Sequence, residues 1–172
     1  MKGFTKITPY EISDNMFTMI NKDWLLTASG TPCDHNMLTC SWGGMGVIWQ
    51  RPVCTVVVRP QRHTYQFLEK NNYFTVSVFS EKYRSALNFC GTKSGRDFDK
   101  AKESGLTPAA VGESVAFEQA RLVLLCKKTY VSDLKKENFL DAKIPGDDYP
   151  EGDFHRVYVG EIVEVYKNDD NR

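Results

Sequence analysis

The segment VVVRPQRHTY, residues Val56–Tyr65, carries the pattern from which the rest of the chain can be interpreted. Its consecutive valines predict a buried strand, and Pro60 predicts where that strand ends, because proline donates no hydrogen bond to a sheet. A short helix is predicted over residues 65–70, with Thr64 as its N-cap. A strand that delivers two arginines to a helix N-terminus is suited to bind an anion, since backbone N–H groups and the helix dipole point there. A solvated turn with two surface arginines is the alternative, and this segment alone leaves both open.

Length and charge limit the protein classes that need to be considered. The chain has 172 residues, with 22 basic and 22 acidic side chains and a net charge of zero. We therefore predict a single domain over residues 1–172, with an N-terminal arm over 1–23. No general positive field attracts nucleic acid or an anionic membrane surface, so any affinity for anions has to be local. No apolar segment approaches the ~18 residues of a membrane span, and the N-terminus lacks the apolar core of a secretory signal.

The cysteines indicate a reducing compartment. There are five, an odd number, and they are widely spaced without a C-x-x-C pair. This pattern argues against a disulfide framework and against a zinc site. We predict a cytoplasmic protein in which the cysteines are mostly small apolar core residues.

Alternating and β-branched segments predict about seven strands. They lie over residues 24–30, 34–40, 53–58, 73–79, 115–117, 120–130 and 154–166. Short helices are predicted over 65–70, over 81–90 between Ser80 and Gly91, and just before Gly105, whereas 144–153 has the composition of a polar loop. Without a repeating βαβ rhythm, the fold class is mainly β, an antiparallel barrel or sandwich with short helical insertions.

Several catalytic chemistries lack their motifs. The three histidines are scattered, and none has a partner at metal-ligand spacing. There is no G-x-S-x-G elbow or S-x-x-K pair for a serine nucleophile. There is also no P-loop, and no G-x-G-x-x-G follows a predicted strand. We therefore predict no metal site and no catalytic residue of these classes.

Three clusters of residues suited to a ligand remain. The first is Asn36, Thr39, Ser41 and Trp42, followed by Gly43, Gly44 and Gly46; the second is Arg59, Arg62, His63, Thr64 and Tyr65; the third is Lys93, Ser94, Gly95, Arg96 and Asp99. Taken singly, each has a simpler explanation: a hairpin bulge, a surface turn and a solvated charged loop. Together they offer hydroxyls and free backbone at a strand end, a basic cradle of phosphate size and a cationic lid. A ligand with a flat hydrogen-bonding head and a phosphate tail, such as flavin mononucleotide (FMN), would use all three.

A family resemblance points the same way. The residues that carry it are Leu26–Gly30, Asn36–Gly44, Pro52, Val58–Tyr65, Phe74–Ser77, Leu87–Asp97 and Asp99–Lys100. In this order and spacing the chain resembles the flavin reductase-like family of FMN-binding split-barrel proteins, which includes flavoredoxin and NAD(P)H:flavin oxidoreductases. The resemblance covers most of the chain from Trp24 to Leu106 and continues more loosely through the C-terminal strands.

The resemblance implies a six-stranded Greek-key split barrel, a homodimer and FMN bound near the subunit interface. Asn36, Thr39, Cys40, Ser41 and Trp42 would then lie along the flavin ring and its ribityl chain. Arg59, Arg62, His63, Thr64 and Tyr65 would hold the phosphate end. Lys93, Ser94 and Arg96 would close over the flavin from either subunit. His155 is a candidate for a nicotinamide contact.

The implied activity is that of an FMN-dependent oxidoreductase, in which a hydride passes from NAD(P)H to the flavin and electrons pass on to free flavin or an electron-transfer protein. The cofactor carries this chemistry, so no protein acid or base is required as a catalytic residue. An FMN electron carrier of flavoredoxin type, without its own NAD(P)H oxidation, is the alternative. A split-barrel protein that binds another anionic ligand or haem, with no redox role, is a third hypothesis.

Overall fold

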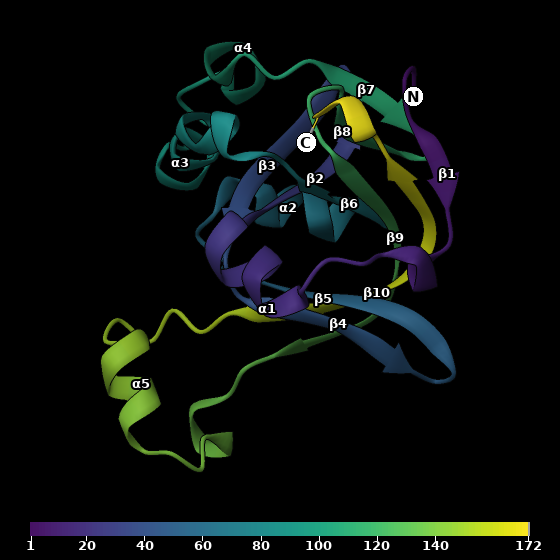
Figure 1. The fold of residues 1–172 in the computed structure, drawn as a ribbon. Helices are drawn as coiled ribbons and strands as arrows, with labels where there is room; N and C mark the ends of the chain where they lie inside the picture. Colours follow the sequence, from purple (N-terminus) through teal and green to yellow (C-terminus); the bar gives the residue numbers. More distant parts are fainter. Residues whose placement is uncertain (172) are drawn as a thin grey trace.

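The computed structural model describes residues 1–171, where antiparallel strands form a strongly curved sheet (Figure 1). The strand order is β3-β2-β6-β9-β10-β5-β4, β1 pairs with β10, and β7 and β8 form a separate hairpin. The described strands are β1 Thr5–Ile7, β2 Leu25–Thr31, β3 Asp34–Cys40, β4 Gly43–Ile48, β5 Arg51–Val58, β6 Tyr73–Val78, β7 Pro108–Val111, β8 Ser114–Phe117, β9 Leu122–Asp133 and β10 Arg156–Lys167. The prediction of a mainly β fold of split-barrel type with short helical insertions is confirmed.

Short helices fill the connections between strands. They are α1 Met16–Thr18, α2 His63–Lys70, α3 Arg84–Thr92, α4 Lys100–Ser104 and α5 Lys143–Asp148. Helix α2 contacts β2 and β3, and α3 contacts β3 and α4, so both lie close to one end strand of the sheet. None of the helices in the described range is long and apolar enough to span a membrane.

Strand β10 joins the two halves of the sheet. Clean alternation predicts one long strand over 154–166, and β10 confirms it. The strand pairs with β9 on one side and β5 on the other, and its inward residues Tyr158 and Val165 are fully buried. Gly160 is needed at the centre, because a Cβ atom there would lie 2.6 Å from Cε1 of Phe74. A larger residue would push β10 away from its neighbours.

The core consists of two clusters of buried side chains. Val56 and Val58, from the valine run of β5, belong to the first cluster together with Phe74 and Tyr158. The second cluster packs β2 and β9 against α3 and the β7–β8 hairpin. Full burial of a side chain of this size contributes about 1.5–3 kcal/mol. Because these clusters hold the strands in place, they also fix the ends of β3 and β5, where the polar segments of the sequence begin.

Three strands are not anticipated by the sequence pattern: β1, β4 and β7. The glycines at 43, 44 and 46 are expected to form a turn or a close approach to a ligand, but they lie in β4, which pairs with β5 as an end strand. Gly43 has a φ of 141°, and a Cβ atom there would lie 2.3 Å from the carbonyl oxygen of Thr55. The glycine thus allows β4 to begin close against β5.

Two helix predictions also need correction. Gly91 is expected to stop the helix after residue 90, but α3 continues to Thr92. Residues 144–153 are expected to form a loop, but α5 begins at Lys143 and runs to Asp148. Pro145 lies in the first turn of α5, where a missing N–H has no intrahelical acceptor to lose.

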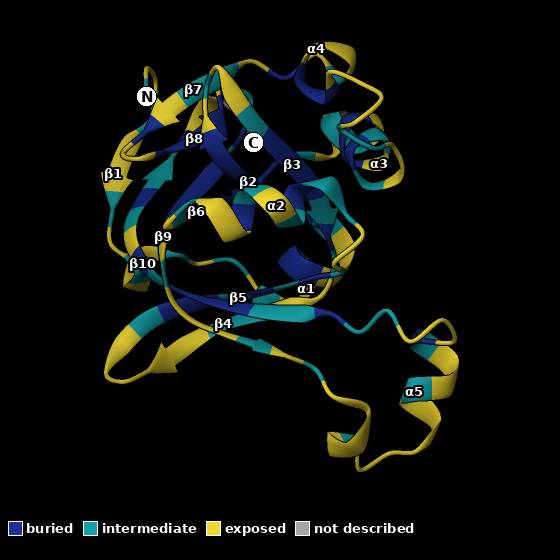
Figure 2. Cartoon of the chain, turned by 180° about the vertical axis from the view of Figure 1, so that it is seen from behind, coloured by how far each residue is buried: buried dark blue, intermediate teal, exposed yellow. Residues whose placement is uncertain are grey.

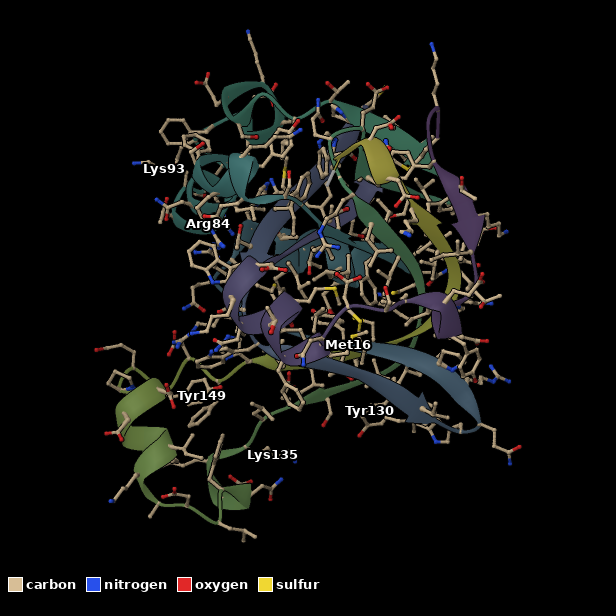
Figure 3. All side chains as sticks on the ribbon, in the orientation of Figure 1. Met16, Arg84, Lys93, Tyr130, Lys135 and Tyr149 are labelled. Carbon is tan, nitrogen blue, oxygen red and sulfur yellow. The ribbon has the colours of Figure 1, made fainter. Side chains whose placement is uncertain are left out.

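The long connection between β9 and β10 forms an arm (residues 134–155) that extends from the barrel (Figure 1). Most of the arm is exposed (Figure 2), and its buried residues are Tyr149 and His155. Tyr149 stacks on Phe154, with ring centroids 4.8 Å apart, and Phe139 packs beside both rings. Figure 3 shows Tyr149 where the arm approaches the barrel. This aromatic cluster anchors the arm at its base.

Candidate functional site

A hollow of about 250 Å³ lies where the end of β3, the end of β5, the last turn of α3 and the start of β10 meet. Its lining residues are Leu38, Thr39, Cys40, Ser41, Trp42, Val57, Arg59, Arg62, Gly91 and His155. The hollow therefore brings together residues from the first two sequence clusters, which are separated along the chain by β4 and β5.

The wall formed by β3 is held against α3. The hydroxyl of Thr39 donates to the carbonyl of Leu87, which ties the strand to the helix. Gly91 makes this packing possible, because a Cβ atom at that position would lie 3.2 Å from Cβ of Thr39. Burial raises the pKa of the neighbouring Cys40 to about 11. The Cys40 thiol therefore stays protonated at neutral pH and is not a nucleophile.

Part of the lining of the hollow is aromatic. Trp42, which follows the end of β3, is partly exposed and lies 5.2 Å from the ring of His155, centroid to centroid. Nδ1 of His155 lies 2.8 Å from the hydroxyl of Tyr149. Burial, with a further contribution from Arg59, lowers the pKa of His155 to about 4. The imidazole is consequently neutral at pH 7 and offers an uncharged polar surface.

The two arginines of the basic segment have different partners. Arg59 pairs with Asp153, donates to the carbonyl of Asp148 at 2.7 Å, and lies 5.1 Å from the ring centroid of Tyr149. Arg62 donates to the carbonyl of Gly91, and it forms no ion pair with a carboxylate among residues 1–171. Arg59 thus belongs to the base of the arm, whereas the charge of Arg62 is left for another anion.

Helix α2 begins one residue before Thr64, so the prediction that Thr64 is its N-cap is wrong. The N-cap is Arg62, and Thr64 lies in the first turn. The Thr64 hydroxyl is buried and donates to Oδ1 of Asn36 at 2.8 Å instead of capping the backbone. A Cβ atom on Gly95 would lie 1.8 Å from Nδ2 of Asn36. Residues of all three predicted clusters therefore meet at Asn36, behind the hollow and not in its lining.

His63 occupies the first position of α2. Its Nδ1 atom is buried without a hydrogen-bond partner in the described structure, and its ring packs edge-on against Phe67 at 5.4 Å. Burial lowers the pKa of His63, with Arg96 and Lys100 adding to the effect. His63 thus places a neutral imidazole with an unpartnered nitrogen at the start of α2, where the N–H of Tyr65 donates to the carbonyl of Arg62 at 3.0 Å.

The other predicted residues lie outside the lining. The Tyr65 ring packs against Tyr158, with centroids 6.4 Å apart, and under Arg156, so it faces the core. Nζ of Lys93 lies 5.7 Å from the ring centroid of Phe98, and the Ser94 hydroxyl accepts from the backbone N–H of Arg96. The Arg96 guanidinium donates to the carbonyl of Gln61 at 3.1 Å, which attaches this loop to the segment before α2.

Sequence reasoning did not select Leu38, Val57 or Gly91 as part of the site. Leu38 and Val57 lie on strands whose alternation indicates only which face is buried. Gly91 has the pattern of a helix stop, and its packing against Thr39 depends on a contact between distant segments. His155, the candidate for a nicotinamide contact, is in the lining.

Chemically, the hollow suits an anionic ligand with a flat ring. Arg62, the N-cap residue of α2, provides positive charge in the lining, and Trp42 and His155 provide aromatic surface. Pockets that enclose a small ligand typically measure ~300–1,000 Å³, so this hollow covers only part of a ligand of nucleotide size. No group of His, Cys, Asp and Glu side chains within residues 1–171 is arranged to bind a metal ion.

Two larger hollows are less suited to an anion. One, of about 440 Å³, contains Arg121, but Asp14 and Asp23 pair with that guanidinium at 2.6 and 3.3 Å. The other, of about 510 Å³, is lined by the carboxylates Asp34 and Asp99 together with Lys100 and Lys102. Both already contain negative charge, which sets the hollow beside Arg62 apart.

Comparisons with known proteins agree with this geometry. A family model described as the flavin reductase like domain matches residues 16–172. A search of curated proteins finds no match. Among solved structures, flavoredoxin of Desulfovibrio vulgaris (Miyazaki F) is 17% identical with a TM-score of 0.67, covering 95% of this chain and 78% of its own.

Two further structures share the fold. An FMN-binding domain of a flavin reductases-like enzyme from Shewanella baltica OS155 is 14% identical with a TM-score of 0.66, covering 96% of this chain and 77% of its own. An NADH:FAD oxidoreductase of Streptomyces globisporus C-1027, in complex with NAD and FAD fragments, is 15% identical with a TM-score of 0.62, covering 84% of this chain and 74% of its own.

Proposed function

The chain belongs to the flavin reductase-like family, and from this premise we propose that it is an FMN-binding oxidoreductase that uses the hollow beside Arg62 as its flavin site. The observation that carries the proposal is the position of Arg62: it is the N-cap of α2, it lines the hollow, and its guanidinium has no carboxylate partner in the described range. A phosphomonoester is the group that such a combination of charge and N–H donors binds best.

At the phosphate end, we assign Arg62 and the first turn of α2 to direct binding. His63, with its unpartnered Nδ1, follows Arg62 at the first position of α2, and we propose that it lies behind the phosphate and not in direct contact with it. Asn36 and Thr64 support this end from behind through their mutual hydrogen bond. We propose that Lys93, Ser94 and Arg96 cover the ligand from their loop, and we assign Tyr65 to the core instead of to the flavin.

At the ring end, Thr39, Cys40, Ser41 and Trp42 would lie along the isoalloxazine and ribityl chain. Once bound, FMN supplies the chemistry of hydride acceptance and electron transfer. The chain's own residues bind and orient it: the wall of β3 is fixed by its bond to α3, and the neutral imidazole of His155 lies on the rim where a nicotinamide can approach. No side chain is assigned as a proton donor or acceptor.

We further propose a homodimer, because the hollow is too small to enclose FMN on its own. Apolar side chains of the β4–β5 hairpin and of β9 are exposed, among them Val47, Trp49, Tyr130 and Val131. The Trp49 and Tyr130 rings lie 6.4 Å apart, and Figure 3 shows Tyr130 on the side of the sheet from which the arm extends. A second copy covering this face would complete the site.

NAD(P)H is the proposed reductant, and free flavin or an electron-transfer protein is the proposed acceptor. The likeness in fold to both a flavoredoxin and an NADH:FAD oxidoreductase supports a second candidate, an FMN electron carrier without its own NAD(P)H oxidation. All five cysteines are free thiols, which supports the proposal of a cytoplasmic protein.

An absorbance spectrum of the purified protein, with added FMN if needed, tests the proposal directly. Flavin bands near ~450 nm that co-elute with the protein are the expected result. A protein that stays colourless and retains no added FMN would contradict the assignment. Steady-state oxidation of NADH and NADPH by the flavin-loaded protein then decides between a reductase and a carrier.

A further inference from the structure

The hollow of about 440 Å³ that contains Arg121 lies between the N-terminal segment (residues 1–23) and the barrel. Ile12, Asp14 and Asp23 line it from the N-terminal segment, and the start of β9, the end of β10 and helix α3 line it from the barrel. Figure 1 shows the segment crossing the barrel between β1 and α1. The flavin reductase like match begins at residue 16, so part of this lining precedes the matched domain. Within the described chain, no residue lines both this hollow and the one assigned to the flavin.

Negative charge exceeds positive charge in this lining. It contains four carboxylates and three cationic side chains, and two of the carboxylates, those of Asp14 and Asp23, share the guanidinium of Arg121. Lys167 is one of the three cations, but it pairs with Asp169, which lies outside the lining. At least one negative charge therefore lacks a counterion in the hollow. An organic cation can supply it, since no group of His, Cys, Asp and Glu side chains in residues 1–171 is arranged to bind a metal ion.

Two polar side chains of the lining lack hydrogen-bond partners. The Ser80 hydroxyl is buried and has no partner in the described structure. Asn168 is 8% exposed, and its Oδ1 atom accepts from the backbone N–H of Asp170 at 3.0 Å, but its Nδ2 atom makes no hydrogen bond within residues 1–171. Buried polar groups without a partner are rare, because burial removes the water that would otherwise bind them. Both groups can donate, so the acceptor they need is an uncharged oxygen, which the carboxylates nearby do not repel.

Apolar side chains form much of the remaining lining: Ile7, Ile12, Phe79, Leu87 and Leu122. Such a wall binds the apolar part of a ligand and keeps water from its charge, which strengthens the attraction between an ammonium and a carboxylate. The volume of about 440 Å³ lies within the ~300–1,000 Å³ of pockets that hold small organic molecules. A ligand that uses the whole lining therefore combines an ammonium, a carbonyl oxygen and an apolar group.

We propose that this hollow is a second binding site, which takes a small organic cation of the α-amino amide class. The carboxylates of Asp14 and Asp23 bind its ammonium, the side chains of Ser80 and Asn168 donate to its carbonyl oxygen, and Phe79 packs against its apolar group. The site goes beyond the proposed function and does not depend on flavin binding.

Calorimetric titration of the full chain with L-phenylalaninamide at pH 6.5, where an α-amino group is protonated, tests the site. We expect saturable binding of one molecule per chain with a Kd below about 1 mM. Two matched probes each lack one group. N-acetyl-L-phenylalaninamide, which has no charge, should bind at least about tenfold more weakly, and phenethylamine, which has no carbonyl, about fivefold more weakly. Absence of binding at about 10 mM L-phenylalaninamide would overturn the site, and equal affinities for the three probes would overturn the ligand class.

Variants locate the binding. Asp14→Asn should weaken L-phenylalaninamide binding about tenfold, whereas Asp133→Asn, which also removes a carboxylate paired with an arginine but lies outside the lining, should leave it unchanged. Ser80→Ala should weaken binding about threefold without lowering the free energy of unfolding, because its hydroxyl has no partner to lose. Ser80→Ala therefore decides if Asp14→Asn does not fold. Unchanged affinity in Ser80→Ala and in any folded Asp14→Asn would overturn the assignment to this hollow. A chain that binds L-phenylalaninamide but no FMN would support this site and overturn the proposed function.

Discussion

The two ends of helix α2 use positive charge in opposite ways. At its C-terminal end, Arg156 forms two bonds to Asp133 at 2.7 and 2.9 Å and one to Glu69 at 2.8 Å. Glu69 also accepts from the hydroxyl of Tyr158 at 2.7 Å. At the N-terminal end, the one side-chain hydrogen bond of Arg62 within residues 1–171 goes to the backbone carbonyl of Gly91. A guanidinium enclosed by carboxylates holds strands to a helix, whereas one without a carboxylate is available to an anion from outside.

The largest expected effect on FMN affinity comes from Arg62, at the N-terminal end of α2. Arg62→Met should lower FMN affinity on the order of a hundredfold, because hydrogen bonds between charged groups are the strongest that a binding site makes. Fluorescence titration with FMN measures this, and Arg62→Lys should recover only part of the affinity. Unchanged FMN affinity in Arg62→Met would show that the guanidinium at the N-terminal end of α2 does not bind the anion.

Removing the enclosed charge should affect folding instead of binding. Arg156→Met leaves Asp133 and Glu69 without their partner, and we expect a loss of about 2 kcal/mol in the free energy of unfolding, since the guanidinium is partly exposed. Urea denaturation measures this loss. FMN affinity should change by less than about twofold; a large drop would show that this end also takes part in binding.

His155 provides a prediction on pH. Its pKa is lowered to about 4 in the folded protein, below the usual 6.5, so the unfolded chain binds the additional proton first. Stability should therefore be full above pH 6.5 and fall as the pH drops from 6.5 toward 4. Comparison of urea denaturation at pH 7 and 4.5 should show about 1–2 kcal/mol more loss in the unaltered chain than in His155→Gln. Equal losses in both proteins would contradict a buried neutral imidazole.

Only a small effect on binding is expected for Arg59, because its charge is already paired with Asp153. Arg59→Met should weaken FMN binding by no more than about threefold, as expected for a charge already neutralised by a neighbour. Asp153→Asn is the matched control and should behave similarly. Limited proteolysis of the arm should be faster in both variants, since each loses the contact at its base. A loss of FMN affinity as large as that of Arg62→Met would place Arg59 in direct contact with the phosphate.

The alternation of β10 and the valine run of β5 could be interpreted from the sequence, because burial on one face imposes a period of two. The glycine-rich β4 could not be predicted, since glycine gives no signal of which face is buried. This strand is instead ordered by its pairing with β5. In α5, Pro145 and Gly146 have turn chemistry, yet both are compatible with a short helix at these positions.

The candidate site was only partly accessible to sequence reasoning. The sequence pattern placed Arg62 and His63 near the start of a helix. It could not indicate that Arg59 would pair with Asp153, 94 residues away. Thr64 was misjudged because its hydroxyl faces Asn36, a contact between distant segments.

The central place of β10 also has a consequence for synthesis of the chain. β10 lies between β5 and β9, but it leaves the ribosome after both of them. Until then β5 and β9 each have one edge without a partner, and exposed edges are where nascent chains associate wrongly. The barrel therefore assembles only after β10 has been made, and the end of β5 that we propose to bind flavin can reach its final place only then.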